Sequence, residues 1–246
     1  QESPFAWLVG EEGEGVKTII PMVHHTRLDA AISSAAMMRL ALAQAAHHAS
    51  HRKAFGKRLI EQPAMRNTLA DIALESEAAL QLVMRLAHSF DETRRDQARE
   101  AFTRLATAVV KFWVCKRTPA TVFEALECLG GGGYVEEGPT ARLYREAPVN
   151  SIWEGAGNVI ALDALRTLAR VPEAVEALRA ELMLAKGADA RLDACLSGID
   201  GTLARPANDE GQARAVVERL ALAWQAGLMV RHAPSVERMR EYFASV

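Results

Sequence analysis

Residues 26–52 read TRLDAAISSAAMMRLALAQAAHHASHR and contain neither glycine nor proline. The stretch is rich in alanine, leucine and methionine, which have high helix propensities, so it predicts a helix of roughly seven turns. In the whole 246-residue chain 50% of the residues are hydrophobic but only 6% are aromatic. This composition favours helices over sheet and supplies enough apolar material for a sizeable core. We therefore expect an all-α protein.

Three further helices are predicted downstream of this one. Pro63 suits the first turn of the second, since a missing N–H costs nothing there, and apolar residues recur along it at helical spacing. A third helix is expected from about residue 96 to 129, ended by the four glycines 130–133. A fourth follows and ends near Arg170. Four such segments predict an antiparallel four-helix bundle over residues 26–170.

The two ends of the chain carry different expectations. Residues 1–25 contain two short apolar runs around GEEGEG, which suits the tail of a middle β-domain. Residues 171–246 read as three or four shorter amphipathic helices, separated near Gly187, residues 205–208 and residues 233–234. The expected organisation is therefore a short β-domain remnant, the helical bundle and a C-terminal helical appendage.

Composition and residue spacing argue against several classes of protein and of binding site. Cys115, Cys128 and Cys195 lie far apart without a CxxC pair, which argues for reduced thiols and against a disulfide framework or a zinc site. No apolar run approaches the ~20 residues that cross a bilayer, and the first residues lack the order of a signal peptide. Neither a GxGxxG nor a GxxxxGK phosphate pattern occurs. We expect a cytoplasmic protein with no metal site and no membrane contact.

The stretch SIWEGAGNVIALDALRTL, residues 151–168, places a carboxylate directly ahead of an amphipathic helix. In one interpretation Ser151 and Glu154 form an S-x-x-E capping box. Two glycines then fall in the first helical turn, where each costs about 1 kcal/mol relative to alanine. In the other, Asn158 is the N-cap and Glu154 projects from a loop of small residues. Such a loop lets a flat ligand approach the backbone, and the helix N-terminus favours an anion. The residues alone leave both interpretations open.

Three motifs, taken together, resemble one known family. The run ECLGGGGYVEEGPTARLYREAPVNSIWEGAGN, residues 127–158, resembles the C-terminal signature of the acyl-CoA dehydrogenase family. HRKAFGKRL, residues 51–59, resembles that family's R-x-x-F-G motif, and Thr26-Arg27 resembles its T-R pair. Within the family the chain is similar to the AidB-type branch of flavoproteins, which is linked to DNA alkylation damage. The resemblance is strong over residues 26–170 and weak beyond.

The resemblance implies a flavoprotein that uses FAD and an acyl-CoA thioester. In the family a carboxylate removes the α-proton of the thioester while a hydride leaves the β-carbon for the flavin, and Glu154 matches the position of that base. Arg166 is implied as a second catalytic residue. The residues implied to bind FAD are Arg52, Phe55, Gln62, Gly130, Gly131, Ile152, Trp153, Gly155, Ala156, Gly157 and Asn158. Those implied to bind the substrate are Arg27, Trp153 and Asn158.

The resemblance also implies self-association, because the family builds its flavin site from two protomers of a homotetramer. Arg52 and Phe55 are thereby expected to reach FAD across a subunit interface. Gly130, Gly131 and the loop at residues 153–158 are expected to line the flavin from their own side. Four departures from the family pattern are an early Gln62, Glu127 in place of glutamine, Ala54 and Ala156 in place of hydroxyl residues, and Trp153 in place of tyrosine.

Two other functions are compatible with the same motifs. AidB-type proteins are thought to bind DNA through their extra C-terminal helices, and duplex DNA is recognised first by positive charge. Residues 171–246 hold nine Lys or Arg and eleven Asp or Glu, a net charge of −2, which does not support DNA binding. A DNA-associated flavoprotein with a vestigial site remains the alternative to a dehydrogenase, and an assembly module is a third hypothesis.

Overall fold

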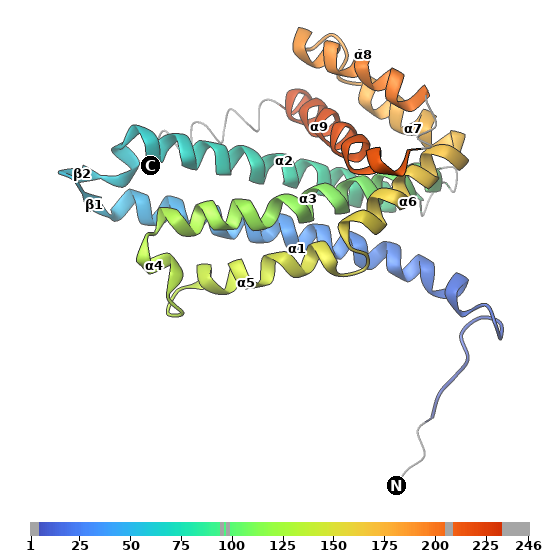
Figure 1. The fold of residues 1–246 in the computed structure, drawn as a ribbon, viewed down its shortest axis with the longest axis horizontal. Coiled ribbons are helices and arrows are strands. Elements are labelled where there is room, and N and C mark those ends of the chain that lie inside the picture. The colour runs from blue at the N-terminus through green and yellow to red at the C-terminus, as the bar shows by residue number, and fades with distance from the viewer. Residues whose placement is uncertain (1–4, 94–95, 97–98, 205–208, 233–246) are drawn as a thin grey trace.

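The computed structural model describes residues 5–93, 96, 99–204 and 209–232, and it is almost entirely helical (Figure 1). The helices are α1 (Gly15–His51), α2 (Pro63–Thr93), α3 (Glu100–Cys128), α4 (Gly131–Tyr134), α5 (Pro139–Ile152), α6 (Gly157–Arg170), α7 (Pro172–Met183), α8 (Ala190–Ala204) and α9 (Ala213–Arg231). Strands β1 (Lys53–Ala54) and β2 (Lys57–Arg58) form a small antiparallel hairpin. Two short 3-10 helices are η1 (Leu59–Glu61) and η3 (Glu210–Gln212). The all-α prediction is confirmed.

A four-helix bundle forms the body of the molecule, with α3 at its centre. α3 packs against α1, α2, α5 and α6, and α1 packs against α2 and α5. α3 contributes Leu105 and Val109, and α1 contributes Ala31, Ala41 and Ala45, all with no exposed surface. Small side chains on α1 let the axes of the two helices approach closely. The predicted bundle is therefore present.

The fourth member of the bundle differs from the single helix predicted after residue 157. α5 fills most of this position, and α6 continues after a break at residues 153–156. The sequence patterns did not indicate α5 because this helix follows a glycine-rich run and carries Pro148 in its interior, where proline usually breaks a helix. Leu143 and Ala147 nevertheless bury one face of α5 in the bundle, and that packing compensates for the proline.

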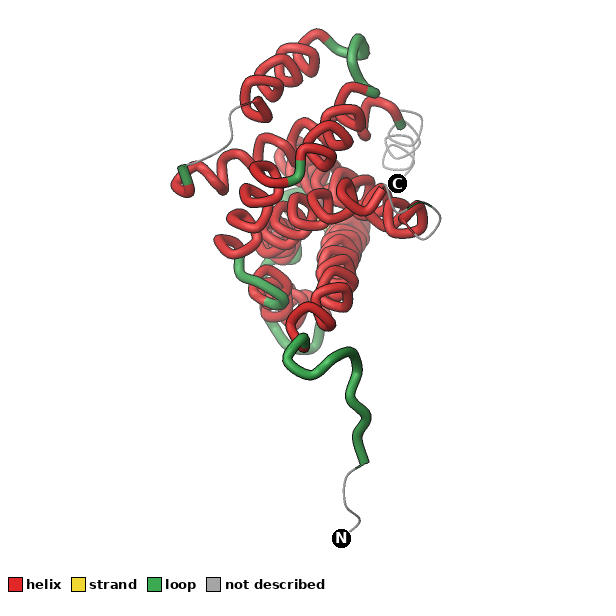
Figure 2. Tube along the Cα trace, turned by 90° about the vertical axis from the view of Figure 1, so that its right-hand side faces the viewer, coloured by secondary structure: helices red, strands yellow, loops and turns green. Residues whose placement is uncertain are grey.

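The first long helix begins earlier than predicted, at Gly15 instead of residue 26. Pro21 lies inside this helix and does not end it, although a proline ring usually clashes with the preceding turn. The described residues before it, 5–14, hold no strand and run away from the bundle as a loop (Figure 2). Large apolar side chains of this part, such as Phe5 and Trp7, are 82% exposed. The expected β structure is therefore not seen in the described part of residues 1–25.

Helices α7, α8 and α9 follow the bundle and share its core. α9 packs against α2, α3 and α6, and α7 packs against α3. Trp224 of α9 is 1% exposed, and its ring meets the edge of Phe102 of α3 with centroids 5.7 Å apart. Aromatic pairs of this geometry add stability beyond their buried area. The segment predicted as an appendage is thus continuous with the bundle core.

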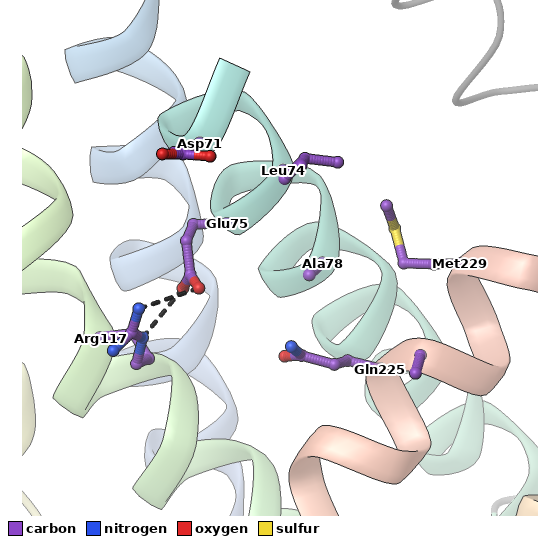
Figure 3. A pocket seen from close by; sticks show the side chains of 8 residues that line it. Asp71, Leu74, Glu75, Ala78, Arg117, Gln225 and Met229 are labelled. Atoms are coloured by element: carbon purple, nitrogen blue, oxygen red, sulfur yellow. Dashed lines mark hydrogen bonds and ion pairs between the residues drawn. The ribbon is translucent and has the colours of Figure 1, made fainter. Parts of the chain in front are cut away.

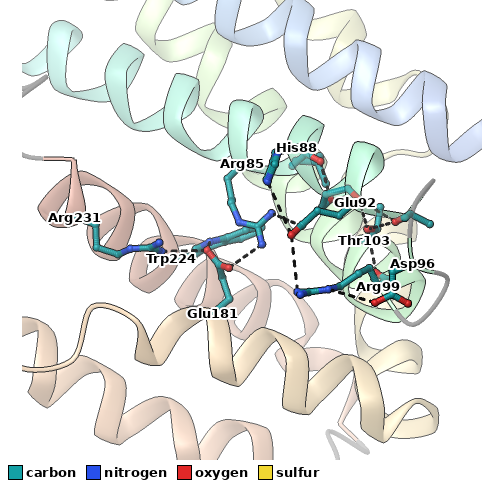
Figure 4. A network of polar contacts seen from close by, with 12 residues as sticks. Arg85, His88, Glu92, Asp96, Arg99, Thr103, Glu181, Trp224 and Arg231 are labelled. Carbon is teal, nitrogen blue, oxygen red and sulfur yellow. Dashed lines mark hydrogen bonds and ion pairs between the residues drawn. The ribbon is translucent and has the colours of Figure 1, made fainter.

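A polar network ties α7 and α9 to α2 (Figure 4). The Glu181 carboxylate accepts hydrogen bonds from Arg85 at 2.9 Å, Trp224 at 3.4 Å and Arg231 at 3.3 Å. Burial alone would raise the pKa of Glu181, but these partners, Arg85 first, hold that pKa below its ordinary value. Arg85 also pairs with Glu92 at 3.1 Å. Because removing one partner of a buried ion pair is costly, the network fixes the C-terminal helices on the bundle.

The longer helices bury apolar side chains against one another. Across residues 5–93, 99–204 and 209–232, none of them is both long enough and apolar enough to span a lipid bilayer. In the same parts of the chain, no three His, Cys, Asp or Glu side chains gather in a way that would hold a metal ion.

Candidate active site

Glu154 lies in a tight turn between α5 and α6, residues 153–156, which we name the Glu154 turn. Its φ is +56° and that of Gly155 is +119°. A positive φ is uncommon outside glycine, and such strained residues cluster at functional sites. Trp153 caps the end of α5 by donating its N–H to the Val149 carbonyl, and Ala156 is the N-cap of α6. The carboxylate residue therefore belongs to neither helix.

This geometry decides between the two interpretations of the stretch. The Ser151 hydroxyl donates to the Pro148 carbonyl within α5 at 2.9 Å, so the capping box is wrong. Glu154 lies in a loop, as the second interpretation predicted. That interpretation is wrong in one detail, because the N-cap of α6 is Ala156 and not Asn158.

Packing restricts the residue that follows Glu154. A Cβ on Gly155 would lie 2.9 Å from Cδ1 of Ile160, and a Cβ on Gly157 would lie 2.7 Å from Cε of Lys116. Ile160 is fully buried, so it has little room to move, whereas Lys116 is exposed and the flexible end of its side chain can move away. Gly155 therefore seats the turn closely on α6.

Two cationic side chains hold the backbone of the turn. Arg27 donates from Nε to the Glu154 carbonyl oxygen at 3.1 Å, and its Nη1 pairs with Oδ2 of Asp163 at 2.9 Å. Lys111 donates from Nζ to the next carbonyl oxygen, that of Gly155, at 2.6 Å. Arg27 was expected to bind substrate. In this structure its guanidinium links the Glu154 turn to α6, and a role in substrate binding stays a prediction.

Lys111 is the residue of this site that the sequence patterns missed. It is 1% exposed and lies on α3 within the run AVVKFWVC. Burial lowers the pKa of its ammonium; the charges of Arg27 and Lys116 act in the same direction, while Cys115 and Glu154 oppose it. The signal in the sequence was a single charge inside an apolar run, which indicates a buried lysine that needs a partner.

The open side of the turn is apolar. Ile152 is 63% exposed, Trp153 61% and Val159 54%, while Glu154 is half-buried and Asn158 is exposed. A group of large exposed apolar side chains beside a carboxylate marks a contact surface more often than bare solvent-facing surface. The Glu154 turn thus has large exposed apolar residues close before and after its carboxylate residue.

Arg166, the second expected catalytic residue, is exposed on α6. It lies nine residues beyond Gly157, roughly 14 Å along the helix axis. Within the described residues it makes no ion pair or hydrogen bond with Glu154. The structure therefore does not bring these two residues together, and a catalytic role for Arg166 stays a prediction.

A second group of expected residues gathers at the other end of the bundle, beside the β1–β2 hairpin. Arg52, Gly130 and Gly131 line an open pocket of ≈560 Å³ together with Ala54 and Glu127. We name this the hairpin pocket. Gly130 has a φ of +61°, so the chain needs a glycine there to turn from α3 into α4.

Phe55 and Gln62 are close in the chain to residues of the hairpin pocket, but neither of them lines it. Phe55 stands at the tip of the hairpin with a φ of +53° and is 94% exposed. Gln62 follows η1, and its side-chain amide donates to the Ala54 carbonyl at 3.4 Å. An aromatic side chain held this far from its own core is available to a ligand or to another chain.

The expected flavin residues therefore form two separate clusters. Gly130 and Gly131 line the same pocket as Arg52, at a distance from the loop at residues 153–158. α5 separates the hairpin pocket from the Glu154 turn by 14 residues, roughly 21 Å. Arg27 and Arg52, on and at the end of α1, are roughly 37 Å apart along that helix. The expectation that Gly130, Gly131 and the loop at residues 153–158 line one flavin from the same protomer stays a prediction, and the sequence patterns did not indicate the helix α5 that separates them.

Another hollow, of ≈470 Å³, lies between α2, α3 and α9 (Figure 3). Asp71, Glu75, Arg117 and Met229 are among the residues that line it. Arg117 donates to both carboxylate oxygens of Glu75, at 2.9 and 3.0 Å, so its charge is already paired. None of the expected site residues lines this hollow.

Comparisons with known proteins point to one family. The family model for the acyl-CoA dehydrogenase C-terminal domain matches residues 13–169. The chain is 42% identical over 233 residues to AidB of Escherichia coli (strain K12), which is named as an acyl-CoA dehydrogenase; the match covers 94% of this chain and 42% of AidB. It is 34% identical over 152 residues to the mitochondrial short-chain specific acyl-CoA dehydrogenase of Bos taurus, covering 62% and 35%. The chain spans less than half the length of these relatives.

Solved structures show the same arrangement of helices. Caenorhabditis elegans ACDH-11 in complex with C11-CoA aligns with a TM-score of 0.80 and 26% identity, covering 92% of this chain and 42% of that one. The apo form of Bd2924 aligns with a TM-score of 0.80 and 28% identity, covering 89% and 44%. Both the Glu154 turn and the hairpin pocket fall inside the range matched by the family model.

Proposed function

This chain belongs to the acyl-CoA dehydrogenase family, and we propose that it serves in the FAD-dependent α,β-dehydrogenation of an acyl-CoA thioester, with Glu154 as the base. The observation that carries the proposal is the Glu154 turn. A half-buried carboxylate residue adopts a left-handed conformation there, and Arg27 and Lys111 hold its backbone from behind. A base must be held in a fixed position relative to the proton that it removes, and this turn supplies that fixity.

The surroundings of Glu154 support proton removal from an apolar acyl chain. The exposed side chains of Ile152 and Trp153 offer contact to such a chain and would exclude water from the reacting carbons once it is bound. The Glu154 carboxylate takes the proton from the α-carbon. FAD, when bound, supplies the acceptor for the hydride that leaves the β-carbon.

The hairpin pocket has features that fit FAD. A Cβ placed on Gly130, Gly131 or Gly132 would meet no atom within 4 Å, so a phosphate can approach the backbone closely. Arg52 supplies positive charge at the same pocket, and Glu127 offsets part of it. In this assignment Arg52 and the glycines hold the phosphates, while Phe55 and Gln62 contact the rest of the cofactor.

The two clusters serve different flavin sites of an assembly. Arg27 and Arg52 lie roughly 37 Å apart along α1, and Phe55 is 94% exposed. We assign the hairpin pocket of one copy to the flavin whose reacting end meets the Glu154 turn of a second copy. The proposal therefore includes self-association to a dimer or tetramer.

An anaerobic titration of the flavin absorbance tests the proposal. The full-length protein, purified with its flavin, is mixed with short straight and branched acyl-CoA thioesters, and bleaching of the oxidised band is expected. Glu154→Gln should retain FAD but slow bleaching by about 10³-fold, within the range for loss of a general base. Glu154→Asp, which keeps a carboxylate, should retain part of the rate. Bleaching of the Glu154→Gln variant at the wild-type rate would remove Glu154 from the mechanism.

The same titration separates the dehydrogenase proposal from the DNA-associated alternative. The net charge of −2 over residues 171–246 gives no support to an electrostatic contact with DNA. A flavin that no thioester bleaches, in a protein that duplex DNA retains in a salt-dependent way, would favour the alternative.

A further inference from the structure

Lys111 occupies a position where a charge is unfavourable. It is 1% exposed, lower than the 8% of Glu181 and the 9% of Glu77. An ammonium loses its hydration when it is buried, which is costly unless a partner compensates. An apolar side chain of similar volume usually fills such a site at no loss of stability. Packing on α3 therefore does not explain why this residue is a lysine.

Its hydrogen bond suggests the reason. Lys111 donates to the Gly155 carbonyl at 2.6 Å, and this is the one hydrogen bond that it makes within the described residues. Arg27 takes the preceding carbonyl, that of Glu154 itself. The successive carbonyl groups of Glu154 and Gly155 are thus both fixed by charged donors, which form stronger hydrogen bonds than neutral ones.

We propose that Lys111 is a positioning residue for Glu154, fixing the Gly155 carbonyl and through it the direction of the Glu154 side chain. The inference rests on the proposed function, because it concerns the same base. The ammonium contacts the turn from α3 and is buried, whereas Ile152 and Trp153 beside the turn are exposed. Lys111 therefore acts through the backbone and does not touch the substrate.

A positioning role and a merely structural role predict opposite results for Lys111→Met. If Lys111 positions the turn, the free energy of unfolding stays equal or rises, because a buried charge is removed. The amide hydrogens of residues 152–160 then exchange about tenfold faster, as expected when a local restraint is lost. Those of residues 52–62, in the hairpin, exchange at the wild-type rate.

The kinetics provide the second readout. At saturating thioester, flavin bleaching by Lys111→Met should slow by about 10- to 100-fold, the effect of a misplaced catalytic group. The thioester concentration at half-saturation should change less than about twofold, because the substitution leaves the contacts that bind the thioester in its ground state intact. Lys111→Gln, which keeps an N–H donor without the charge, should fall between wild type and Lys111→Met in both exchange and rate.

Lys116→Met is the matched control. Lys116 lies on the same helix and its side chain runs beside Gly157, but it is exposed and donates to no carbonyl of the turn among the described residues. The same chemical change there should alter the bleaching rate less than about twofold, because no restraint on the turn is removed.

Three outcomes would overturn the inference. The first is a Lys111→Met variant whose amide exchange and flavin bleaching rate equal those of wild type. The second is a bleaching rate that falls only in proportion to the loss of global stability or of folding. The third is a Lys111→Gln variant that bleaches no faster than Lys111→Met. Failure of the proposed function is recognised separately, because Glu154→Gln would then bleach normally. The exchange measurement needs no thioester, so it still reports on the contact between Lys111 and the turn.

Discussion

The Glu154 turn and the hairpin pocket both contain residues in the left-handed region, but packing enforces that conformation in only one of them. At the turn, a Cβ on Gly155 would clash with Ile160, and charged side chains hold the two carbonyls. At the hairpin, Phe55 is 94% exposed and a Cβ on Gly56 would meet nothing within 4 Å. Contacts within one chain therefore preorganise the turn, whereas the exposed tip of the hairpin lacks comparable packing; in our proposal FAD and a second copy complete it.

The largest effect that separates the two regions is expected from valine at their glycines. Gly155→Val adds both backbone strain and a clash, so we expect the free energy of unfolding to fall by about 4 kcal/mol. Gly56→Val adds strain without a clash and should cost about 2 kcal/mol. Urea unfolding followed by circular dichroism measures both. Equal losses would mean that the turn is no more tightly packed than the hairpin.

A smaller effect is expected at the tip of the hairpin. Phe55→Ala removes a side chain that contributes almost nothing to the core, so the free energy of unfolding should change by less than about 0.5 kcal/mol. FAD affinity should fall about tenfold, or about 1.4 kcal/mol, as measured by release of flavin fluorescence. Phe123→Ala, at an aromatic that is 40% exposed on α3, is the control and should leave FAD affinity unchanged. If both variants hold FAD like wild type, the hairpin does not contact the cofactor.

The smallest effect concerns the pH dependence of stability at the turn. The pKa of Lys111 lies below its ordinary value of 10.5 in the folded protein, so in the window between the two values the unfolded chain binds more protons. Stability from this group therefore rises with pH through that window. Urea midpoints at pH 8 and pH 10 should show this rise in wild type but not in Lys111→Met. Parallel pH profiles of the two proteins would show that Lys111 does not titrate as a buried cation.

Much of the fold follows from local patterns in the sequence. The absence of glycine and proline in residues 26–52 and the Pro63 start of α2 predicted two long helices correctly. α5 escaped prediction because Pro148 lies inside it and glycines precede it, and only tertiary packing overrides such local signals. The core that α9 shares with the bundle was not predicted for the same reason, since the contact of Trp224 with Phe102 joins residues far apart in the chain.

The candidate site shows the same division between local and long-range information. Motif resemblance identified Glu154 and Arg27, which the structure brings into contact through the Glu154 carbonyl. It could not find Lys111, because the hydrogen-bond partner of this lysine lies 44 residues away in the chain. A contact over that separation produces no recognisable residue spacing in either segment. Nor could it separate Gly130 from the turn, because that depends on α5 lying between them.

The central claim is that the Glu154 turn and the hairpin pocket of one chain serve different flavins. Mixed assemblies test it directly: Glu154→Gln and Arg52→Glu chains, each inactive alone, are co-expressed with different tags and purified through both. In a symmetric pair one site then receives both defects and the other receives neither. The mixed pair should regain about half of the wild-type rate of flavin bleaching, because one of its two sites is intact. Mixed pairs that stay as inactive as the two parents would contradict it, because each flavin would then be held by a single chain.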